Sequence, residues 1–363
     1  MQMMQVAKRM VNKTSNAPFH FTLFVTNKCN NFCQHCFYWE SLNQPSIDEL
    51  KVEEIEKMSK SMGDIFTLLL TGGETYLRKE LPQIVKAFYK NNHIKNLITP
   101  TNGMMTKQVV QIVIQILEEC PKISYTVQIS LDGLEELHDE IRKVKGCFKR
   151  AVKTHKELMK LSEKYPNLKV TVASCINKLN QDTIDELYYY VRDELKSEFA
   201  LTFLRGTPKN PKLVDVDSKR YKNLYKEVES HDENHGKRIG LKHLTNYENL
   251  KKFMRYKMSA IRIDLITDTY DKGKFVTPCY AGSLNAVMYE NGDLYPCELL
   301  GTKKIGNIRD VNYNFQTLWN SDKAKEYRKW ILDSKCFCTH ECYYQQNIMF
   351  NPKMLGRMVF GKD

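Results

Sequence analysis

The sequence predicts an α/β protein, a partial TIM-like (β/α)6 barrel followed by a small cysteine-rich domain. Three observations support this prediction. Short apolar runs alternate with helical patterns between residues 19 and 206, and polar segments that contain glycine follow several of these runs. Beyond residue 278, five cysteines gather in a stretch that no longer alternates in this way.

Six segments have the composition of buried strands, being short and rich in Val, Ile, Leu, Phe and Thr. They are Phe19–Thr26, Phe66–Thr71, Asn96–Pro100, Ile123–Ser130, Leu168–Ile176 and Glu198–Leu204. Five segments with helical patterns lie between them, at Val52–Ser61, Leu81–Lys90, Lys107–Glu119, Phe148–Lys164 and Thr183–Lys196. Because strands and helices alternate, we expect one parallel sheet with helices outside it, curved into a partial barrel.

Parallel sheets of this kind carry their chemistry on the loops that follow the strands. Polar segments stand at four of these positions: Thr71-Gly72-Gly73-Glu74, Thr101-Asn102-Gly103, Ser130-Leu131-Asp132-Gly133 and Arg205-Gly206. A loop with three cysteines follows the first strand. We therefore expect five loops to converge on one rim of the barrel.

The alternation stops after Gly206, which predicts a domain boundary there. We expect an N-terminal extension over 1–18, the barrel over 19–206, a helical connector over 207–262, a small domain over 263–350 and a tail over 351–363. In the small domain, Asn291-Gly292 between two short apolar runs predicts a β-hairpin, whose turn positions need positive φ. The apolar spacing of Phe315–Leu332 predicts one helix.

The composition limits the class of protein. Lys and Arg number 55 against 43 Asp and Glu, a net charge of +12 that favours phosphorylated or carboxylated partners. The basic residues form no stripe interleaved with aromatic residues, so we expect no nucleic-acid binding. No secretory signal precedes the first strand and no run of ~18 apolar residues occurs, so we expect a cytoplasmic protein without a membrane span.

The three cysteines of the first loop are Cys29, Cys33 and Cys36. Clustered cysteines in an intracellular chain of this length indicate metal ligands before disulfides. Three thiolates on one short loop can hold three corners of an iron–sulfur cubane and leave one iron open to another ligand. Zinc would need a fourth ligand, and His35 lies too near Cys36 in the sequence to complete a tetrahedron easily. Inert buried cysteines are the remaining alternative, although the polar residues between them are unlike a core.

The Cys-x3-Cys-x2-Cys spacing, with Gly-Gly-Glu after the next strand, resembles the radical S-adenosylmethionine (SAM) enzymes. In that family the open iron is chelated by the amino and carboxylate groups of SAM, and one-electron reduction releases a 5′-deoxyadenosyl radical. The resemblance, which extends to Ser-Leu-Asp-Gly and a later Ile-Arg, implies a set of SAM contacts. These are Gly72, Gly73, Glu74, Asn102, Ser130, Asp132 and Arg142. The chemistry agrees, because glycine permits close approach to a ligand, a carboxylate can pair with an ammonium and a guanidinium suits a carboxylate.

Some of these positions have a simpler alternative. Without the resemblance, Asp132 is an acid in a turn, Arg142 an exposed charge on a helix and Asn102 a turn residue. The position before the third cysteine is usually aromatic in the family and packs near the adenine. Here it is His35, whose imidazole can also stack.

A second group of cysteines comprises Cys279, Cys297, Cys336, Cys338 and Cys342. Cys279-x12-Gly292-x4-Cys297 resembles the opening of the SPASM and twitch modules that many radical SAM enzymes carry. Five cysteines suit one auxiliary [4Fe–4S] cluster with one thiol left over, and the sequence leaves open which two of the last three are ligands. A structural zinc site is the alternative, in which His340 could take part.

The resemblance implies an enzyme that cleaves SAM reductively and abstracts hydrogen from a substrate, oxidising or rearranging it with help from the auxiliary cluster. Its electron donor would be flavodoxin or ferredoxin. The positive charge favours a small anionic metabolite such as a sugar, nucleoside or cofactor precursor. A peptide-modifying maturase is the alternative, although only 28 residues precede Cys29, too few for an N-terminal peptide-recognition domain. A non-catalytic iron–sulfur or zinc protein is a further alternative.

Overall fold

A continuous nine-stranded sheet forms the centre of the computed structural model, which describes residues 15–231 and 247–360. The order of the strands is β6-β5-β4-β3-β2-β1-β7-β8-β9. Their bounds are β1 His20–Thr26, β2 Thr67–Gly72, β3 Asn96–Thr101, β4 Ser124–Ser130, β5 Leu168–Ile176, β6 Glu198–Phe203, β7 Asn285–Met288, β8 Asp293–Tyr295 and β9 Gly306–Asn307. Neighbouring strands from β1 to β6 are all parallel. The predicted α/β class and partial parallel barrel are confirmed.

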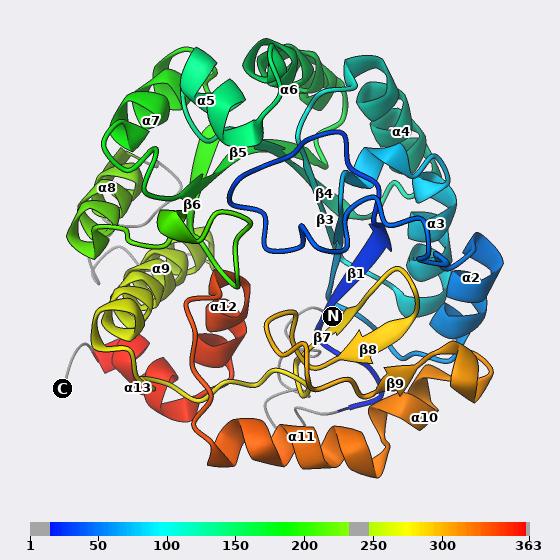
Figure 1. Ribbon diagram of the computed structural model, residues 1–363. Helices are drawn as coiled ribbons and strands as arrows, with labels where there is room; N and C mark the ends of the chain where they lie inside the picture. The colour runs from blue at the N-terminus through cyan, green and yellow to red at the C-terminus, as the bar shows by residue number, and fades with distance from the viewer. Residues whose placement is uncertain (1–14, 232–246, 361–363) are drawn as a thin grey trace.

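Helices surround the outside of this barrel (Figure 1). Those between the strands are α2 Val52–Lys60, α3 Leu81–Asn92, α4 Thr106–Glu119, α5 Glu135–Arg142, α6 Cys147–Lys164 and α7 Ile184–Asp193. They are followed by α8 Ser218–His231, α9 Tyr247–Lys272, α10 Phe315–Trp319, α11 Asp322–Asp333, α12 Glu341–Met349 and α13 Pro352–Phe360. Single 3-10 turns are η1 Thr75–Leu77, η2 Pro211–Leu213 and η5 Arg309–Val311. None of the described helices is long and apolar enough to cross a membrane.

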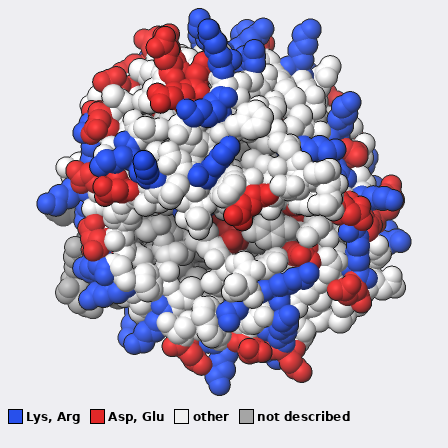
Figure 2. Space-filling model, in the orientation of Figure 1, with Lys and Arg blue, Asp and Glu red and all other residues white. Residues whose placement is uncertain are grey.

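The strands of the barrel are buried unevenly on their two faces. On β4, Tyr125, Val127 and Ile129 are fully buried in the core that the outer helices cover, whereas the alternating Thr126 and Gln128 are half-buried. Successive side chains of a strand point to opposite faces, so the half-buried row faces the barrel interior. The interior is therefore not a filled core, and the space-filling view is hollowed near the centre of this face (Figure 2).

The C-terminal hairpin joins the barrel sheet instead of forming a sheet of its own. β7 pairs in parallel with β1, with His20 opposite Asn285, and β8 pairs antiparallel with β7. The predicted hairpin is present, but of the Asn-Gly pair only Gly292 takes a positive φ, of 88°. The turn closes with a hydrogen bond from the Gly292 amide to the Tyr289 carbonyl, 2.9 Å. A single left-handed position at glycine is typical of the longer hairpin loops.

The prediction of one helix over Phe315–Leu332 is wrong. The structure has two helices, α10 and α11, separated by Asn320 and Ser321. The Ser321 hydroxyl accepts a hydrogen bond from the Ala324 amide, 3.2 Å, and so caps the N-terminus of α11. Serine is favoured at such caps, and this local interaction outweighs the continuous apolar spacing.

The connector after β6 is helical where the structure describes it. The predicted helical connector over 207–262 contains α8 and the first part of α9, which continues to Lys272, and residues 232–246 lie outside the described residues. These helices cover the free edge of the barrel, where the ring of Phe203 on β6 stacks against Tyr270 of α9 at 4.8 Å. One continuous hydrophobic core runs from Ala17 to Met358 and includes barrel, connector and C-terminal helices.

Candidate active site

The cysteine loop follows β1 and is closed by two asparagines. The Asn27 side-chain amide donates to the Ser41 carbonyl at 3.0 Å and to the Gln44 carbonyl at 2.9 Å. The Asn43 side chain accepts from the Cys29 amide at 2.9 Å and donates to the Cys29 carbonyl at 3.1 Å. These bonds fix the first cysteine before any metal binds, because both of its backbone groups are engaged.

The other side of the cysteine loop is fastened to the end of α5. The Phe32 amide donates to the Arg142 carbonyl at 3.1 Å, and the Gln34 amide donates to the Ile141 carbonyl at 2.9 Å. The buried Asn31 side chain donates to the Cys147 thiol at 3.3 Å. Cys147 belongs to neither group of cysteines, and its contact with Asn31 connects the cysteine loop to the start of α6.

The Gly-Gly-Glu segment after β2 packs directly against the start of the cysteine loop. The Gly73 amide donates to the Thr26 carbonyl at 2.9 Å, and the Glu74 amide to the Lys28 carbonyl at 2.8 Å. A Cβ atom on Gly73 would lie 2.2 Å from the Lys28 carbonyl oxygen, and one on Gly72 would lie 2.2 Å from the Thr26 carbonyl oxygen. Only glycine permits this approach of the two backbones.

The Glu74 carboxylate is buried and held by three donors. It accepts from the Tyr76 amide at 3.2 Å, the Thr101 hydroxyl at 2.7 Å and the Asn102 amide at 2.7 Å. Burial raises the pKa of Glu74 above its usual range. The Asn102 side chain donates to the Asn30 side chain at 2.7 Å. Glu74 and Asn102, from the loops after β2 and β3, thus reach the cysteine loop together.

Asp132 and Arg142 form a buried ion pair beside the cysteine loop. The Arg142 guanidinium donates to the Asp132 carboxylate from Nε at 2.8 Å and from Nη2 at 2.7 Å. The same carboxylate accepts from the Cys175 amide at 3.0 Å. Burial alone would raise the pKa of Asp132, but Arg142 and the nearby histidines outweigh it and hold this pKa at about 2. Arg142 is therefore a buried charge, and not an exposed one on a helix.

His35 and Ser130 complete the expected set around this ion pair. His35 Nε2 lies 3.8 Å from the Asp132 carboxylate, and its buried Nδ1 has no hydrogen-bond partner among the described residues. Ser130 ends β4 and continues the half-buried row of Thr126 and Gln128 that faces the barrel interior. The structure thus brings all the expected SAM-site residues to the carboxyl rim of β1 to β4.

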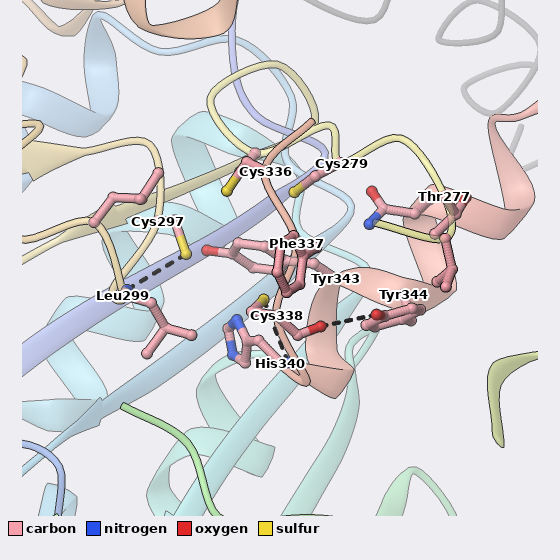
Figure 3. Close-up of a pocket in the computed structure, with 14 residues that line it drawn as sticks. Thr277, Cys279, Cys297, Leu299, Cys336, Phe337, Cys338, His340, Tyr343 and Tyr344 are labelled. Carbon is pink, nitrogen blue, oxygen red and sulfur yellow. Dashed lines mark hydrogen bonds between the residues drawn. The ribbon is translucent and has the colours of Figure 1, made fainter. Parts of the chain in front are cut away.

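Four cysteines of the second group line one cavity of about 130 Å3 (Figure 3). They are Cys279, Cys297, Cys336 and Cys338. The Leu299 amide donates to the Cys297 thiol and the His340 amide to the Cys338 thiol, each at 3.4 Å. The side chain of Cys342, the fifth cysteine expected here, lies outside the described side chains.

A buried polar group that sequence analysis missed lies between the two cysteine sites. The Glu298 carboxylate lies 2.9 Å from Nε2 of His340 and 2.9 Å from Nε of Arg205. Burial opposes its ionisation, but Arg205 and His340 hold the pKa of Glu298 at about 2. The Arg205 guanidinium also stacks over the ring of Phe37, 4.9 Å from its centre. Glu298 directly follows Cys297 and belongs to no sequence motif, so the sequence alone could not predict its role.

The chemistry of both sites fits iron–sulfur clusters. Burial raises the pKa of Cys29 to about 11 and that of Cys33 to about 12, and a bound cationic metal would stabilise their thiolate forms at neutral pH. Among the described residues, no three His, Cys, Asp or Glu side chains converge as they would around a single ion. The unpartnered His35 nitrogen and the glycine cradle fit a polar ligand beside the first cluster.

Two family models match this chain in the order that the structure shows. Residues 23–191 match the radical SAM superfamily, and residues 279–343 match the iron–sulfur cluster-binding domain called SPASM. The chain therefore belongs to the radical SAM superfamily. Within it, the chain is one of the members with a C-terminal SPASM-type domain, and these members use SAM, a [4Fe–4S] cluster and auxiliary iron–sulfur clusters.

Curated relatives include proteins of different function. The sporulation killing factor maturation protein SkfB of Bacillus subtilis (strain 168) is 33% identical over 48% of this chain and 39% of its own length. The antilisterial bacteriocin subtilosin biosynthesis protein AlbA of the same organism is 26% identical over 89% of this chain and 64% of its own length. The chain thus spans less than two thirds of either protein. A GTP 3′,8-cyclase of Clostridium botulinum (strain Hall) is 24% identical over 88% of this chain and 93% of its own length.

Among solved structures, that of Streptococcus suis SuiB bound to S-adenosylmethionine is similar in fold. It superposes with a TM-score of 0.61 at 17% identity, covering 89% of this chain and 71% of SuiB. This similarity shows the fold of the chain, and its substrate has to be inferred from other observations.

Proposed function

We propose that this protein cleaves SAM reductively at the cysteine loop and uses the resulting radical to abstract hydrogen from a peptide. The observation that carries the proposal is the presence of two cysteine sites in one fold with a continuous sheet. Cys29, Cys33 and Cys36 offer three thiols for a cluster with an open iron, and the second cavity offers four. A [4Fe–4S] cluster held by these three thiols would supply the electron for cleavage of SAM to methionine and a 5′-deoxyadenosyl radical.

The chain's own residues would position SAM for this step. We assign Glu74 to the SAM ammonium, since a buried carboxylate held by three donors gains most from a cation nearby. Gly72 and Gly73 would admit the amino acid moiety beside the cysteine loop. Asp132 accepts two hydrogen bonds from Arg142 and would orient its guanidinium. We assign the Arg142 guanidinium to the SAM carboxylate.

The remaining expected contacts would bind the nucleoside part of SAM. We assign the buried, unpartnered His35 ring to the adenine and Ser130 to the ribose, with Asn102 fixing the cysteine loop through Asn30. The cavity lined by Cys279, Cys297, Cys336 and Cys338 would hold a second [4Fe–4S] cluster. A cluster with four protein ligands has no open iron for SAM, so it would be available to accept one electron from the substrate radical, which then becomes the oxidised product.

A peptide is the substrate that we favour. Both SkfB and AlbA are named for the maturation or biosynthesis of a killing factor and a bacteriocin, and AlbA aligns with 89% of this chain. A small anionic metabolite is the second candidate, because the GTP 3′,8-cyclase aligns over 93% of its own length and the net charge is +12. Isotopic labelling separates the two. Deuterium from a labelled substrate peptide should appear in 5′-deoxyadenosine, whereas transfer from a labelled nucleotide instead would contradict the peptide assignment.

Anaerobic reconstitution tests the cluster assignments. We expect about eight irons per chain, ~4 for each cubane, and formation of 5′-deoxyadenosine with dithionite as reductant. Cys33→Ala should lose about half of the iron and all SAM cleavage. Cys297→Ala should also lose about half of the iron. It should still cleave SAM but should not form the modified substrate.

Cys120→Ala serves as the matched control for both variants. Cys120 is buried against the barrel core in the hydrophobic cluster and belongs to neither site. Its removal should change neither the iron content nor the SAM cleavage. Undiminished SAM cleavage in Cys33→Ala would overturn the proposed function.

A further inference from the structure

A surface hollow of about 550 Å3 lies directly against the cysteine loop. It is lined by Phe32, Gln34, Lys143, Lys209, Asn210 and Pro211. These residues come from three segments: the cysteine loop, the residue after α5, and the segment between β6 and α8. No part of the proposed SAM site or of the C-terminal cavity lines this hollow, so neither of those assignments accounts for it.

The hollow is a preformed surface, because backbone hydrogen bonds join its three segments. The Phe32 amide donates to the Arg142 carbonyl at 3.1 Å, which fixes the loop to the end of α5. The Asn210 amide donates to the Gln34 carbonyl at 2.9 Å, and the Lys209 amide donates to the Cys36 carbonyl at 3.1 Å. A partner can therefore bind this surface without first rearranging it.

The lining combines an exposed aromatic ring with two positive charges. Phe32 stands between two cysteines of the first site, yet 54% of its surface is exposed. Lys143 and Lys209 also line the hollow and are exposed. Neither lysine forms an ion pair with a described acidic residue. Aromatic anchors within a charged rim are typical of protein–protein interfaces.

The position of this surface indicates what kind of partner it fits. The first cluster must receive one electron for each SAM that is cleaved, and electron transfer slows steeply with distance. A protein seated on Phe32 would bring its redox group next to Cys33, and two lysines would attract a partner with an acidic surface. No acidic residue lines the hollow to oppose such a partner.

We propose that the surface formed by Phe32, Lys143 and Lys209 docks a small acidic electron-transfer protein, which reduces the first cluster. The inference rests on the proposed SAM cleavage, since it requires the cluster at Cys29, Cys33 and Cys36. In each encounter the reduced carrier loses one electron and the cluster gains it, without any bond being made or broken. The encounter is expected to be weak and sensitive to salt, as for other redox complexes.

The test compares two reductants on the reconstituted protein, with 5′-deoxyadenosine formation as the readout. One reductant is reduced flavodoxin and the other is dithionite, which needs no docking surface. With flavodoxin, the Lys143→Glu/Lys209→Glu variant should show a KM for flavodoxin roughly tenfold higher and a much weaker dependence on salt. With dithionite, the same variant should match the unmodified protein.

The matched control is Lys122→Glu/Lys164→Glu, which changes the net charge equally. Both lysines are exposed at the opposite edge of the barrel, where β4 begins and α6 ends. This variant should behave like the unmodified protein with both reductants. A rise in KM for flavodoxin equal to that of the test variant would overturn the docking surface in favour of a general charge effect.

Phe32→Ala separates docking from an electrostatic effect on the cluster, since Lys209 also lies near Cys36. It should raise the KM for flavodoxin, and the reduction potential of the first cluster, measured in the same variant, separates this effect from a change in the cluster itself. An unchanged KM for flavodoxin in both variants would overturn the proposal, as would a raised KM for the substrate peptide alone. Absence of SAM cleavage with dithionite in the unmodified protein would instead contradict the proposed function.

Discussion

Glu74 shows how one side chain can be prepared for a ligand by its neighbours. Its carboxylate accepts from one hydroxyl and two backbone amides, from Thr101, Asn102 and Tyr76. Burial still raises its pKa, so these donors do not fully compensate the lost hydration. A cation placed beside Glu74 would supply the missing compensation, which is the physical reason for assigning it to the SAM ammonium.

The close approach of Gly73 to Lys28 gives a first prediction at the residue scale. Gly73→Ala would place a Cβ atom 2.2 Å from the Lys28 carbonyl oxygen, and the cysteine loop would have to move. We expect SAM to bind at least ~10-fold more weakly, which corresponds to a loss of ~1.4 kcal/mol in binding free energy. Equilibrium titration of the reconstituted protein with SAM measures this.

Gly301→Ala is the control for this substitution, since a Cβ atom on Gly301 would meet nothing within 4 Å. It should leave SAM binding unchanged. Equal SAM affinities of the two variants would show that the glycine cradle does not shape the site.

The Asp132–Arg142 ion pair gives a second prediction. Arg142→Met leaves a buried carboxylate without its counter-charge, which typically costs 3–5 kcal/mol of stability for such pairs. We expect a loss of this size in the free energy of unfolding, measured by denaturant titration. Asp132→Asn/Arg142→Met should lose less than the sum of the two single variants, because neither charge is then left alone.

Strictly additive losses in this double-mutant cycle would mean that the pair is not coupled as its distances of 2.7 and 2.8 Å require. Conversely, retention of SAM affinity in the double variant would remove Arg142 from the proposed set of SAM contacts.

At the scale of elements, the barrel and the C-terminal hairpin are joined by an ion pair that links α2 to η5. The Glu54 carboxylate receives the Arg309 guanidinium at 2.8 and 3.0 Å and the Tyr313 hydroxyl at 2.8 Å. It also accepts from the Lys51 amide at 2.7 Å, at the start of α2. Its hydrogen bonds with Arg309 are the main cause that lowers the pKa of Glu54 to about 2.

This lowered pKa makes stability depend on pH in a defined direction. The folded-state pKa lies below the unfolded value of 4.5, so the stabilisation is complete above pH 4.5 and is lost as the pH falls toward 2. We expect the free energy of unfolding of Glu54→Gln at pH 7 to be about 2 kcal/mol lower than that of the unmodified protein, allowing for solvent screening.

Thermal unfolding at pH 7, 5.5 and 4 checks this prediction. The difference in melting temperature between Glu54→Gln and the unmodified protein should be the same at pH 7 and 5.5 and should be smaller at pH 4. Glu53→Gln, exposed on the same helix, is the control. A difference in melting temperature that grows toward pH 4 would contradict the assignment of this stabilisation to ionised Glu54.

The sequence was most informative about regular elements and least about contacts between distant ones. The six barrel strands were predicted to within one residue at each end, because a buried parallel strand leaves a compact apolar run. The Asp132–Arg142 pair and the Glu54–Arg309 link could not be predicted. In each case two ordinary charged residues meet only when the chain is folded, and for Glu54 and Arg309 this happens across 255 positions.

The two cysteine sites illustrate the same limit. Cys29, Cys33 and Cys36 stand close in sequence, so their spacing alone indicated a shared ligand. The ligands of the second cavity were ambiguous, because Cys279 and Cys336 approach each other only through the fold. Glu298 escaped notice for the same reason, since Arg205 and His340 reach it from distant elements.

At the scale of the whole molecule, the two functional halves share one sheet and one core. β7 occupies the edge of β1 that the six-stranded barrel alone would leave open. An exposed edge of an apolar strand is a template for aggregation. A chain that ends after residue 276 should therefore aggregate, and size-exclusion chromatography after expression would check this.

Supplying residues 277–363 as a separate chain during expression should restore part of the soluble protein if edge protection is the cause. A monodisperse truncated barrel, with normal SAM cleavage, would show instead that β1 needs no cover.

The central position of β1 has a consequence for how the molecule opens. The strand is hydrogen-bonded to β2 on one side and to β7 on the other, and all seven of its residues are buried. Its amides should be among the slowest to exchange with deuterated water, since exposing them requires both neighbouring strands to separate. The cysteine loop begins where this strand ends, and the hairpin that carries Cys297 begins with its partner strand. Oxidative loss of either proposed cluster should therefore speed amide exchange around the other cysteine site, so that the stability of each site depends on the other.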